Sequence, residues 1–167
     1  RAVAEARGDP VRALAVSSLG EAMVPVSADG HLLGPSILNF DARGDEYISG
    51  LASAIDPAEL YRISGNTLGN HFGLTKLMWL RDHAAATYRE AHRFLLWGSL
   101  VGHLLGAEPA VDPSLANRTL LFDLERGEWS HDLAALAGIN HTKLPMVAPA
   151  GTVIGRVRPR LAASLGL

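Results

Sequence analysis

The segment that decides the fold is 14-LAVSSLGEAMVPVSADGHLLGPSILNFDAR-43. Three short apolar runs, at residues 14–16, 22–26 and 36–38, alternate in it with small and polar residues. The pair Asp29-Gly30 lies between the second and third runs and is typical of a tight turn, because glycine readily adopts a positive φ. The pattern predicts three short β-strands connected by loops.

Polar side chains stand at the ends of these predicted strands. Glu21 directly precedes the second strand, whereas Asn39, Asp41 and Arg43 follow the third. Proteins with α/β folds build small-molecule sites from polar side chains in the loops at strand ends. We therefore expect these strand ends to form the rim of a binding site rather than part of the core.

The rest of the chain is mainly helical by pattern. Asp56-Pro57 and Asp112-Pro113 are typical helix starts, because Asp caps free N–H groups and Pro lacks one that the first turn would leave unpaired. Leu74, Leu77 and Met78 share one helix face, which predicts a buried helix. We expect helices at residues 1–7, 45–54, 56–64, 72–83, 98–106, 112–122, 130–138 and 159–167, a strand at 93–97, a polar link at 88–92 and a loop region from 144 onward. The sequence therefore predicts an α/β fold in which helices outnumber strands.

Composition disfavours several classes of function. The chain of 167 residues, 48% hydrophobic and 19% charged, is long enough for one domain or part of one. A net charge of −2 argues against a nucleic-acid-binding surface, and the absence of cysteine excludes disulfides and thiolate metal sites. The 7 histidines lack ligand spacing, so no metal site is expected. The most apolar window, residues 94–105, is too short to span a membrane, and nothing at the start resembles a signal peptide, so we expect a cytoplasmic location.

A series of short motifs resembles a known protein family. In order along the chain they are 17-SSLGEA-22, 37-ILNFDAR-43, 63-ISG-65, 72-FGLTKLMWL-80, 112-DPSLA-116, 119-TLLFD-123 and 128-EWS-130, followed by Leu144-Pro145 and Gly155. Their order and spacing are similar to those of the FGGY carbohydrate kinases, which include xylulokinase and glycerol kinase. The resemblance covers almost the whole chain.

The resemblance implies a fold, an activity and a domain boundary. The fold would be part of a ribonuclease H-like, actin-like ATPase domain with a short mixed sheet and predominant helices. The activity would be transfer of the γ-phosphoryl group of ATP, with Mg²⁺, to a hydroxyl of a small sugar or polyol. In this family the first phosphate-binding hairpin precedes the matched region, and the catalytic Asp and the C-terminal ATP domain follow it. We therefore expect residues 1–167 to be an incomplete N-terminal domain that holds no catalytic residue or cofactor and is inactive alone.

Glu21 is the first candidate substrate-binding residue. From the residues alone, it is either a solvated turn residue or an acceptor for sugar hydroxyls. In glycerol kinase-like members a Glu at this point contacts the substrate, which favours the second interpretation. Gly20 departs from the Arg of that pattern, and Gly20-Glu21 departs from the Met-His of xylulokinases. The resemblance therefore indicates neither glycerol nor xylulose as the substrate.

Asn39, Asp41 and His71 are the other candidates for contact with substrate hydroxyls. Asn39 stands where many relatives carry Trp, which implies a more polar pocket, although it also fits a simple strand end. Asp41 and Arg43 are two residues apart, so an ion pair that orders the loop is expected first and substrate contact second. His71 matches a position where relatives place a Tyr or Arg that reaches the sugar, and it otherwise fits an exposed loop residue.

Two other functions remain open from the sequence. A non-catalytic sugar-binding or interaction domain derived from such a kinase would keep the same pocket. An unrelated α/β hydrolase is disfavoured, because Ser17-Ser18 lacks the Gly-x-Ser-x-Gly pattern around its serine. The expected partner is a small sugar or polyol. A homodimer is also possible, because the predicted strand at residues 14–16 would leave an unpaired edge.

Overall fold

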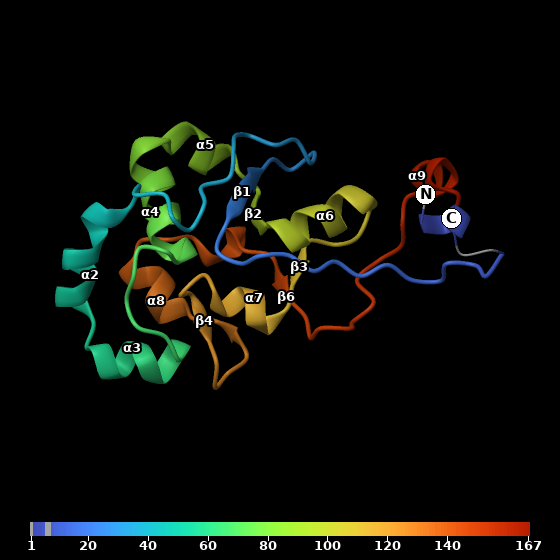
Figure 1. The fold of residues 1–167 in the computed structure, drawn as a ribbon. Helices are drawn as coiled ribbons and strands as arrows, with labels where there is room; N and C mark the ends of the chain where they lie inside the picture. Colours follow the sequence, from blue (N-terminus) through green and yellow to red (C-terminus); the bar gives the residue numbers. More distant parts are fainter. Residues whose placement is uncertain (1, 6–7) are drawn as a thin grey trace.

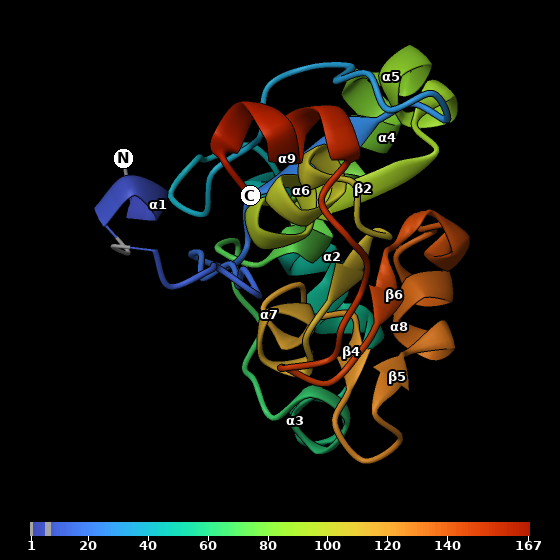
Figure 2. The same cartoon turned by 90° about the vertical axis from the view of Figure 1, so that its right-hand side faces the viewer.

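The computed structural model describes residues 2–5 and 8–167. In this part of the chain most helices pack around three two-stranded sheets, and the first and last helices lie apart at one side (Figures 1 and 2). The strands are β1 (Met23–Val26), β2 (Arg93–Leu96), β3 (Ala110–Val111), β4 (Phe122–Asp123), β5 (Glu128–Trp129) and β6 (Met146–Val147). The helices are α1 (Ala2–Glu5), α2 (Ile48–Ala54), α3 (Pro57–Ser64), α4 (Gly73–His83), α5 (Ala85–Glu90), α6 (Trp97–Leu105), α7 (Pro113–Asn117), α8 (His131–Leu136) and α9 (Pro159–Leu165), with short 3₁₀ helices η1 (Asp45–Tyr47) and η2 (His141–Lys143). The main core cluster draws buried side chains from α3, α4, α5, β2, β4 and α8.

The longest sheet joins two strands that the sequence predicted. β1 and β2 pair antiparallel, with Met23 opposite Leu96, and both strands are almost completely buried. Within the described residues, the strand pairing on the other side of β1 consists of two isolated bridges, from Met23 to Ile37 and from Val26 to Leu32. The third predicted strand, at residues 36–38, is therefore reduced to the single bridging residue Ile37.

The prediction of a strand at residues 14–16 is wrong. This segment has no regular structure and belongs to an irregular stretch between α1 and β1 (Figure 1). Its apolar side chains remain exposed, at 51% for Leu14 and 41% for Val16. A strand needs a neighbouring strand to bond its backbone groups, and the described residues place none beside this segment.

The predicted cap residues begin their helices. Asp56, Asp112 and Ser130 each accept hydrogen bonds from backbone N–H groups in the first turn of α3, α7 and α8. For Asp56 the donors are the N–H groups of Ala58 and Glu59, at 2.8 and 3.2 Å. Local sequence is sufficient to place these helix starts, because the cap and its donors lie within three residues of each other.

Three predicted boundaries differ from the structure. α7 ends at Asn117 rather than near residue 122, because Leu120 is fully buried with a left-handed φ of 62° that no helix continues through. The expected polar link at residues 88–92 is partly α5, where Tyr88 is buried and its hydroxyl accepts a hydrogen bond from the N–H of Asn140 at 3.0 Å. The expected loop region after residue 144 contains β6, which pairs parallel with β3. Part of the expected helix at 1–7 (residues 1, 6 and 7) lies outside the described residues.

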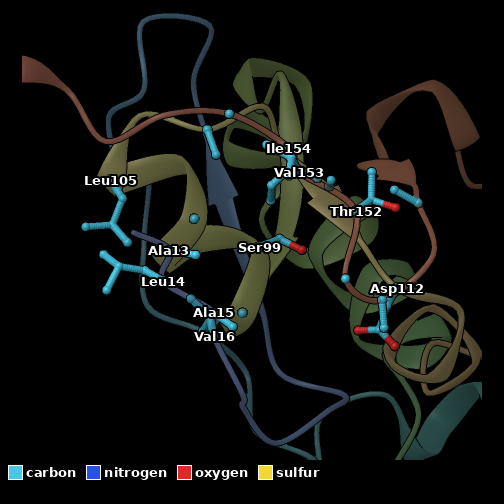
Figure 3. A pocket seen from close by; sticks show the side chains of 18 of the residues that line it. Ala13, Leu14, Ala15, Val16, Ser99, Leu105, Asp112, Thr152, Val153 and Ile154 are labelled. Atoms are coloured by element: carbon cyan, nitrogen blue, oxygen red, sulfur yellow. The ribbon is translucent and has the colours of Figure 1, made fainter. Parts of the chain in front are cut away.

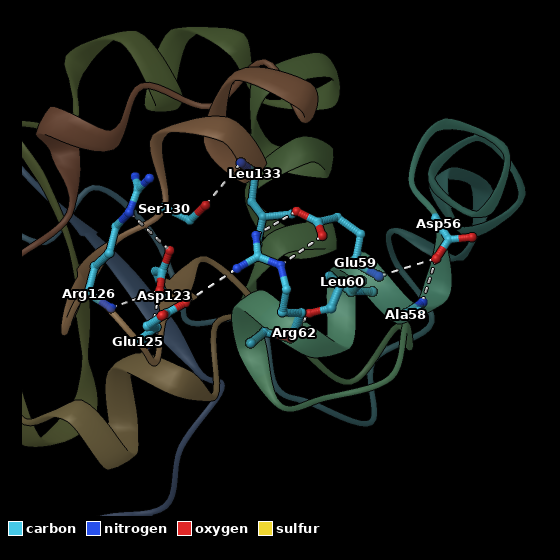
Figure 4. A network of polar contacts seen from close by, with 11 residues as sticks. Asp56, Ala58, Glu59, Leu60, Arg62, Asp123, Glu125, Arg126, Ser130 and Leu133 are labelled. Carbon is cyan, nitrogen blue, oxygen red and sulfur yellow. Dashed lines mark hydrogen bonds and ion pairs between the residues drawn. The ribbon is translucent and has the colours of Figure 1, made fainter.

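Surface ion pairs link α3 to the β4–β5 turn. Arg62 of α3 pairs with Glu59 at 2.8 Å and reaches Glu125 of the turn at 3.4 Å (Figure 4). The Asp123 carboxylate accepts hydrogen bonds from the backbone N–H groups of Glu125 and Arg126 and so shapes the turn. Because the ion pairs are exposed to water, they contribute little to stability.

A buried lysine attaches the loop after residue 40 to α4. Lys76 lies in α4 with only 2% of its surface exposed, and its ammonium donates hydrogen bonds to the carbonyl oxygens of Asp41 and Arg43 at 2.6 and 2.8 Å. Burial lowers the pKa of Lys76. Gly44 closes the same loop with a φ of 97°, and a Cβ there would lie 2.8 Å from the carbonyl oxygen of Thr75. The loop is therefore packed directly against α4.

The expected pair of Asp41 and Arg43 is confirmed. The Asp41 carboxylate accepts hydrogen bonds from the backbone N–H and the Nε of Arg43, both at 2.9 Å, and from its Nη2 at 2.5 Å. These bonds hold the pKa of Asp41 at about 2, below its ordinary value of 3.8. The Arg43 guanidinium in turn lies 5.0 Å from the centre of the Trp79 ring on α4.

Replacing Lys76 by Met should lower the free energy of unfolding by about 1–3 kcal/mol, because the carbonyl oxygen of Arg43 would lose its donor and that of Asp41 would keep only the longer bond from Asn70. Urea denaturation measures this change. Arg126→Met is the matched control, since its side chain is 65% exposed, and it should shift stability by less than about 0.5 kcal/mol. Equal stability of the two variants would show that the lysine does not hold the loop.

Acidification should destabilise the protein partly through Asp41. Its folded pKa of about 2 lies below the ordinary value, so the carboxylate stabilises the fold above about pH 4 and this contribution disappears as pH falls through about 2. Asp41→Asn should therefore lose less stability than wild type between pH 5 and pH 2, measured by urea unfolding at each pH. Substitution of the exposed Asp9 by Asn should leave the wild-type decline unchanged. Parallel curves for wild type and Asp41→Asn would contradict the assignment.

Candidate functional site

Glu21 is buried and paired, so it is not a solvated turn residue. It precedes β1 with a left-handed φ of 68°, and only 8% of its surface is exposed. Its Oε1 accepts a hydrogen bond from Nε of Arg118 at 2.6 Å and forms an ion pair with Nη2 of the same residue. A carboxylate buried to this extent needs a paired cation, and the chain supplies it from a position 97 residues away.

Arg118 was not among the residues that the sequence predicted. Its guanidinium lies 4.9 Å from the centre of the Phe72 ring. A Cβ at Gly20 would lie 2.8 Å from Cγ and 2.9 Å from Cβ of Arg118, so the missing side chain at Gly20 makes room for the arginine stem. The available signal was a glycine before a carboxylate, but nothing in the sequence indicates which of the arginines would fill the space.

His71 lies beside this pair. It is exposed in the loop before α4, and its ring centre is 4.0 Å from that of Phe72. Because Arg118 contacts the same phenylalanine, His71 and Arg118 share a neighbour. The backbone joins the same places, since the N–H of Gly73 donates to the carbonyl of Arg118 at 3.4 Å.

Asn39 and Asp41 lie on the adjacent loop. Asn39 occupies a half-buried turn, and within the described residues its side chain makes no hydrogen bond, so the amide is available to a ligand. Asp41 is bound to Arg43. Asn70 connects this loop to the loop before α4, because its Nδ2 donates to the carbonyl oxygens of Asp41 and Ala42 at 3.2 and 3.4 Å.

The structure therefore gathers the four predicted residues at neighbouring loops without direct bonds between them. Glu21 and His71 are connected by two intervening side chains, because Arg118 contacts both Glu21 and Phe72 and the ring of Phe72 contacts His71. The loop of His71 is connected to Asp41 by the hydrogen bond from Asn70. The groups that these loops carry are carboxylates, a guanidinium, an imidazole and an amide. Such a set can accept from and donate to the hydroxyls of a small polar molecule. The described residues form no group of three or more His, Asp or Glu side chains that could hold a metal ion.

A large groove elsewhere on the molecule is a separate feature. It has a volume of about 1040 Å³ and lies between the segment 11–16, α6 and residues 148–157 (Figure 3). Its walls are mostly backbone and apolar side chains, and none of the four predicted residues lines it. Among the described residues, Ser99 in this wall has the one fully buried side-chain oxygen or nitrogen without a hydrogen-bond partner.

The described helices are all too short or too polar to span a membrane.

Comparison with known proteins adds a family and its relatives. The model of the N-terminal domain of the FGGY family of carbohydrate kinases matches residues 2–167. An autoinducer-2 kinase of Photorhabdus laumondii is 31% identical to this chain over 160 residues, which are 94% of this chain and 30% of that kinase. The chain thus spans about 30% of the length of this curated relative.

Solved structures agree with the architecture. The gluconate kinase from Lactobacillus acidophilus superimposes with a TM-score of 0.85 at 19% identity, covering 99% of this chain and 34% of that one. The xylulose kinase from Rhodospirillum rubrum gives a TM-score of 0.80 at 29% identity, covering 87% of this chain and 30% of that one. These similarities confirm the actin-like fold expected from the sequence, and the chain belongs to the FGGY family of carbohydrate kinases.

Proposed function

We propose that this chain forms the sugar-side part of an ATP-dependent kinase that phosphorylates a hydroxyl of a small sugar or polyol. The observation that supports this most is the buried Glu21 carboxylate. Arg118 contacts only Oε1 of Glu21. The other carboxylate oxygen, Oε2, makes no hydrogen bond within the described residues and is accessible to solvent. A carboxylate oxygen held in this way accepts a hydrogen bond from a sugar hydroxyl without having to be ordered first.

The other three candidates would complete the polar wall. Asn39 would offer an amide donor and acceptor, and the exposed imidazole of His71 would reach a hydroxyl from the neighbouring loop. Asp41 receives three hydrogen bonds from Arg43, and a carboxylate has about four acceptor positions, so one position remains for a substrate. Its larger role would be to hold the loop that carries Asn39.

The phosphoryl-transfer chemistry would come from outside residues 1–167. We assign the described residues substrate binding and no step of the phosphoryl transfer. In the proposed kinase this chain is an incomplete N-terminal domain, and the phosphate-binding hairpin, the catalytic Asp and the ATP domain lie elsewhere in the intact polypeptide. A cytoplasmic location belongs to the same proposal, because the donor is ATP.

We also propose a homodimer, although residues 14–16 do not form the strand whose unpaired edge suggested it from the sequence. Its support is now the exposed apolar stretch that contains Val11, Leu14 and Val16. Burying this stretch against a second copy would remove apolar surface from water. Sedimentation of the chain as a single monomeric species at high concentration would exclude it.

Kinetics of the full-length polypeptide test the function. With ATP and a panel of pentuloses, aldonates and polyols, it should release ADP in a sugar-dependent manner, whereas residues 1–167 alone should not, because loss of a catalytic base costs about 10²–10⁴-fold. Glu21→Gln removes one charge-assisted hydrogen bond worth roughly 1.5–3 kcal/mol and should raise the sugar KM about tenfold or more, with the KM for ATP unchanged.

The exposed Glu128, changed to Gln, provides the matched control and should keep wild-type values. An increase in KM at constant kcat would mean that Glu21 binds ground state and transition state alike, and a lower kcat would mean that it positions the reacting hydroxyl. Wild-type sugar kinetics in Glu21→Gln would contradict the role of Glu21. Sugar binding without turnover in the full-length protein would favour the non-catalytic alternative.

A further inference from the structure

We propose that Arg118 determines substrate specificity, because its free edge binds a carbonyl or carboxylate oxygen next to the hydroxyl bound by Glu21. The site would thus prefer a ketose or an aldonate to the corresponding polyol. This inference rests on the proposed function and extends it to a residue and a substrate class. It follows from how the arginine is held and from the donors that its contacts leave unused.

The backbone of Arg118 is rigidly placed. The residue directly follows α7, and its carbonyl accepts a hydrogen bond from the N–H of Gly73, at the start of α4. The next carbonyl, of the fully buried Thr119, accepts from the N–H of Leu74 at 2.8 Å. The start of α4 therefore fixes the point from which the arginine side chain extends.

The side chain is equally constrained. Its stem occupies the space that a side chain at Gly20 would take, and its guanidinium lies against the Phe72 ring. Nε and Nη2 both bind the same oxygen of Glu21. A planar group held along one edge and one face has a single orientation, so its opposite edge is aimed in a defined direction.

That opposite edge carries unused donors. A guanidinium has five N–H groups, and the contacts with Glu21 use two of them. Nη1 makes no hydrogen bond within the described part of the chain, and 37% of the side chain is exposed. The free Oε2 of Glu21 and the free Nη1 donors of Arg118 therefore belong to one ion pair, which offers an acceptor and a donor to the same ligand.

This arrangement fits a hydroxyl next to an oxygen that only accepts. The hydroxyl donates to Oε2 of Glu21, and the neighbouring carbonyl or carboxylate oxygen accepts from Nη1 of Arg118. A hydroxyl oxygen of a polyol can also accept from Nη1, but its own proton must then point away from the guanidinium and from Oε1 of Glu21, which is already occupied twice. A carbonyl or carboxylate oxygen carries no such proton, and a carboxylate forms a stronger, charge-assisted hydrogen bond with the guanidinium.

The test compares matched substrates in the full-length polypeptide that contains this chain. The first pair, xylulose and xylitol, compares a carbonyl with a hydroxyl. The second pair, gluconate and sorbitol, compares a carboxylate with a hydroxyl. Arg118→Met keeps an unbranched apolar stem and removes every donor. This variant should raise KM for both members of a pair, because Glu21 loses its partner. The rise should be about tenfold or more greater for the ketose or aldonate than for the matching polyol, because the former has the more favourable bond to Nη1 to lose.

Arg62→Met serves as the matched control, since it removes an exposed guanidinium whose ion pairs are with Glu59 and Glu125 (Figure 4) and not with any of the candidate site residues. It should leave both the KM values and their ratio at wild type. Gly20→Ala is the second variant, in case Arg118→Met does not fold. Its new Cβ would displace the arginine stem, so the preference for the carbonyl or carboxylate compound should fall in the same direction.

The ratio of the two KM values within a pair shows whether Arg118 determines specificity or only supports the structure of the site. Equal increases in KM for both members of each pair would mean that Arg118 only neutralises Glu21, and an unchanged ratio in Gly20→Ala would mean the same. A wild-type enzyme that phosphorylates polyols as well as ketoses and aldonates would also overturn the inference while leaving the proposed kinase intact. Failure of the wild-type protein to bind or phosphorylate any member of the panel would instead overturn the proposed function.

Discussion

The position of the loop that carries Asn39 and Asp41 depends on one buried cation. Lys76 places an ammonium group inside the protein with 2% of its surface exposed, where its hydrogen-bond partners among the described residues are the backbone carbonyls of residues 41 and 43. A buried ammonium without acceptors is strongly unfavourable, so the chain must bring these carbonyls to α4. The same contact places Asp41, Arg43 and the preceding turn with Asn39 beside the start of that helix. The burial of this single charge thus positions the loop that carries two of the four candidate residues.

A second charge constraint operates at the Glu21 side of the site. Glu21 lies in a left-handed backbone conformation that residues other than glycine rarely adopt, and it is almost completely buried. Such local strain persists only where the surroundings over-determine the conformation. Here Arg118, Phe72 and the bare Gly20 provide those surroundings through an ion pair, a ring contact and a space of matching size. Strained and paired polar groups of this kind are common at binding sites, because they remain ordered before the ligand arrives.

Sequence patterns succeeded where the contacts that stabilise an element lie close together in the chain. The starts of α3, α7 and α8 follow from capping side chains that bond N–H groups two or three residues ahead. The pair of Asp41 and Arg43 is also local, and it was expected for that reason. Patterns failed where the deciding contact is distant. Tyr88 looked polar in its neighbourhood, yet it joins a helix because its ring packs against Phe94 and its hydroxyl bonds the backbone of Asn140.

The amino-acid sequence by itself determined the α/β class with predominant helices, the family, the main helix starts and the loops that hold Glu21, Asn39, Asp41 and His71. These follow from periodicity, capping and ordered motifs, all of which act over a few residues. Only the tertiary structure decided that residues 14–16 form no strand, that α7 stops at Asn117 and that Arg118 is the partner of Glu21. Strand pairing and charge pairing join residues far apart in the chain, and the free energy of burial, which no local pattern records, selects among the possible partners.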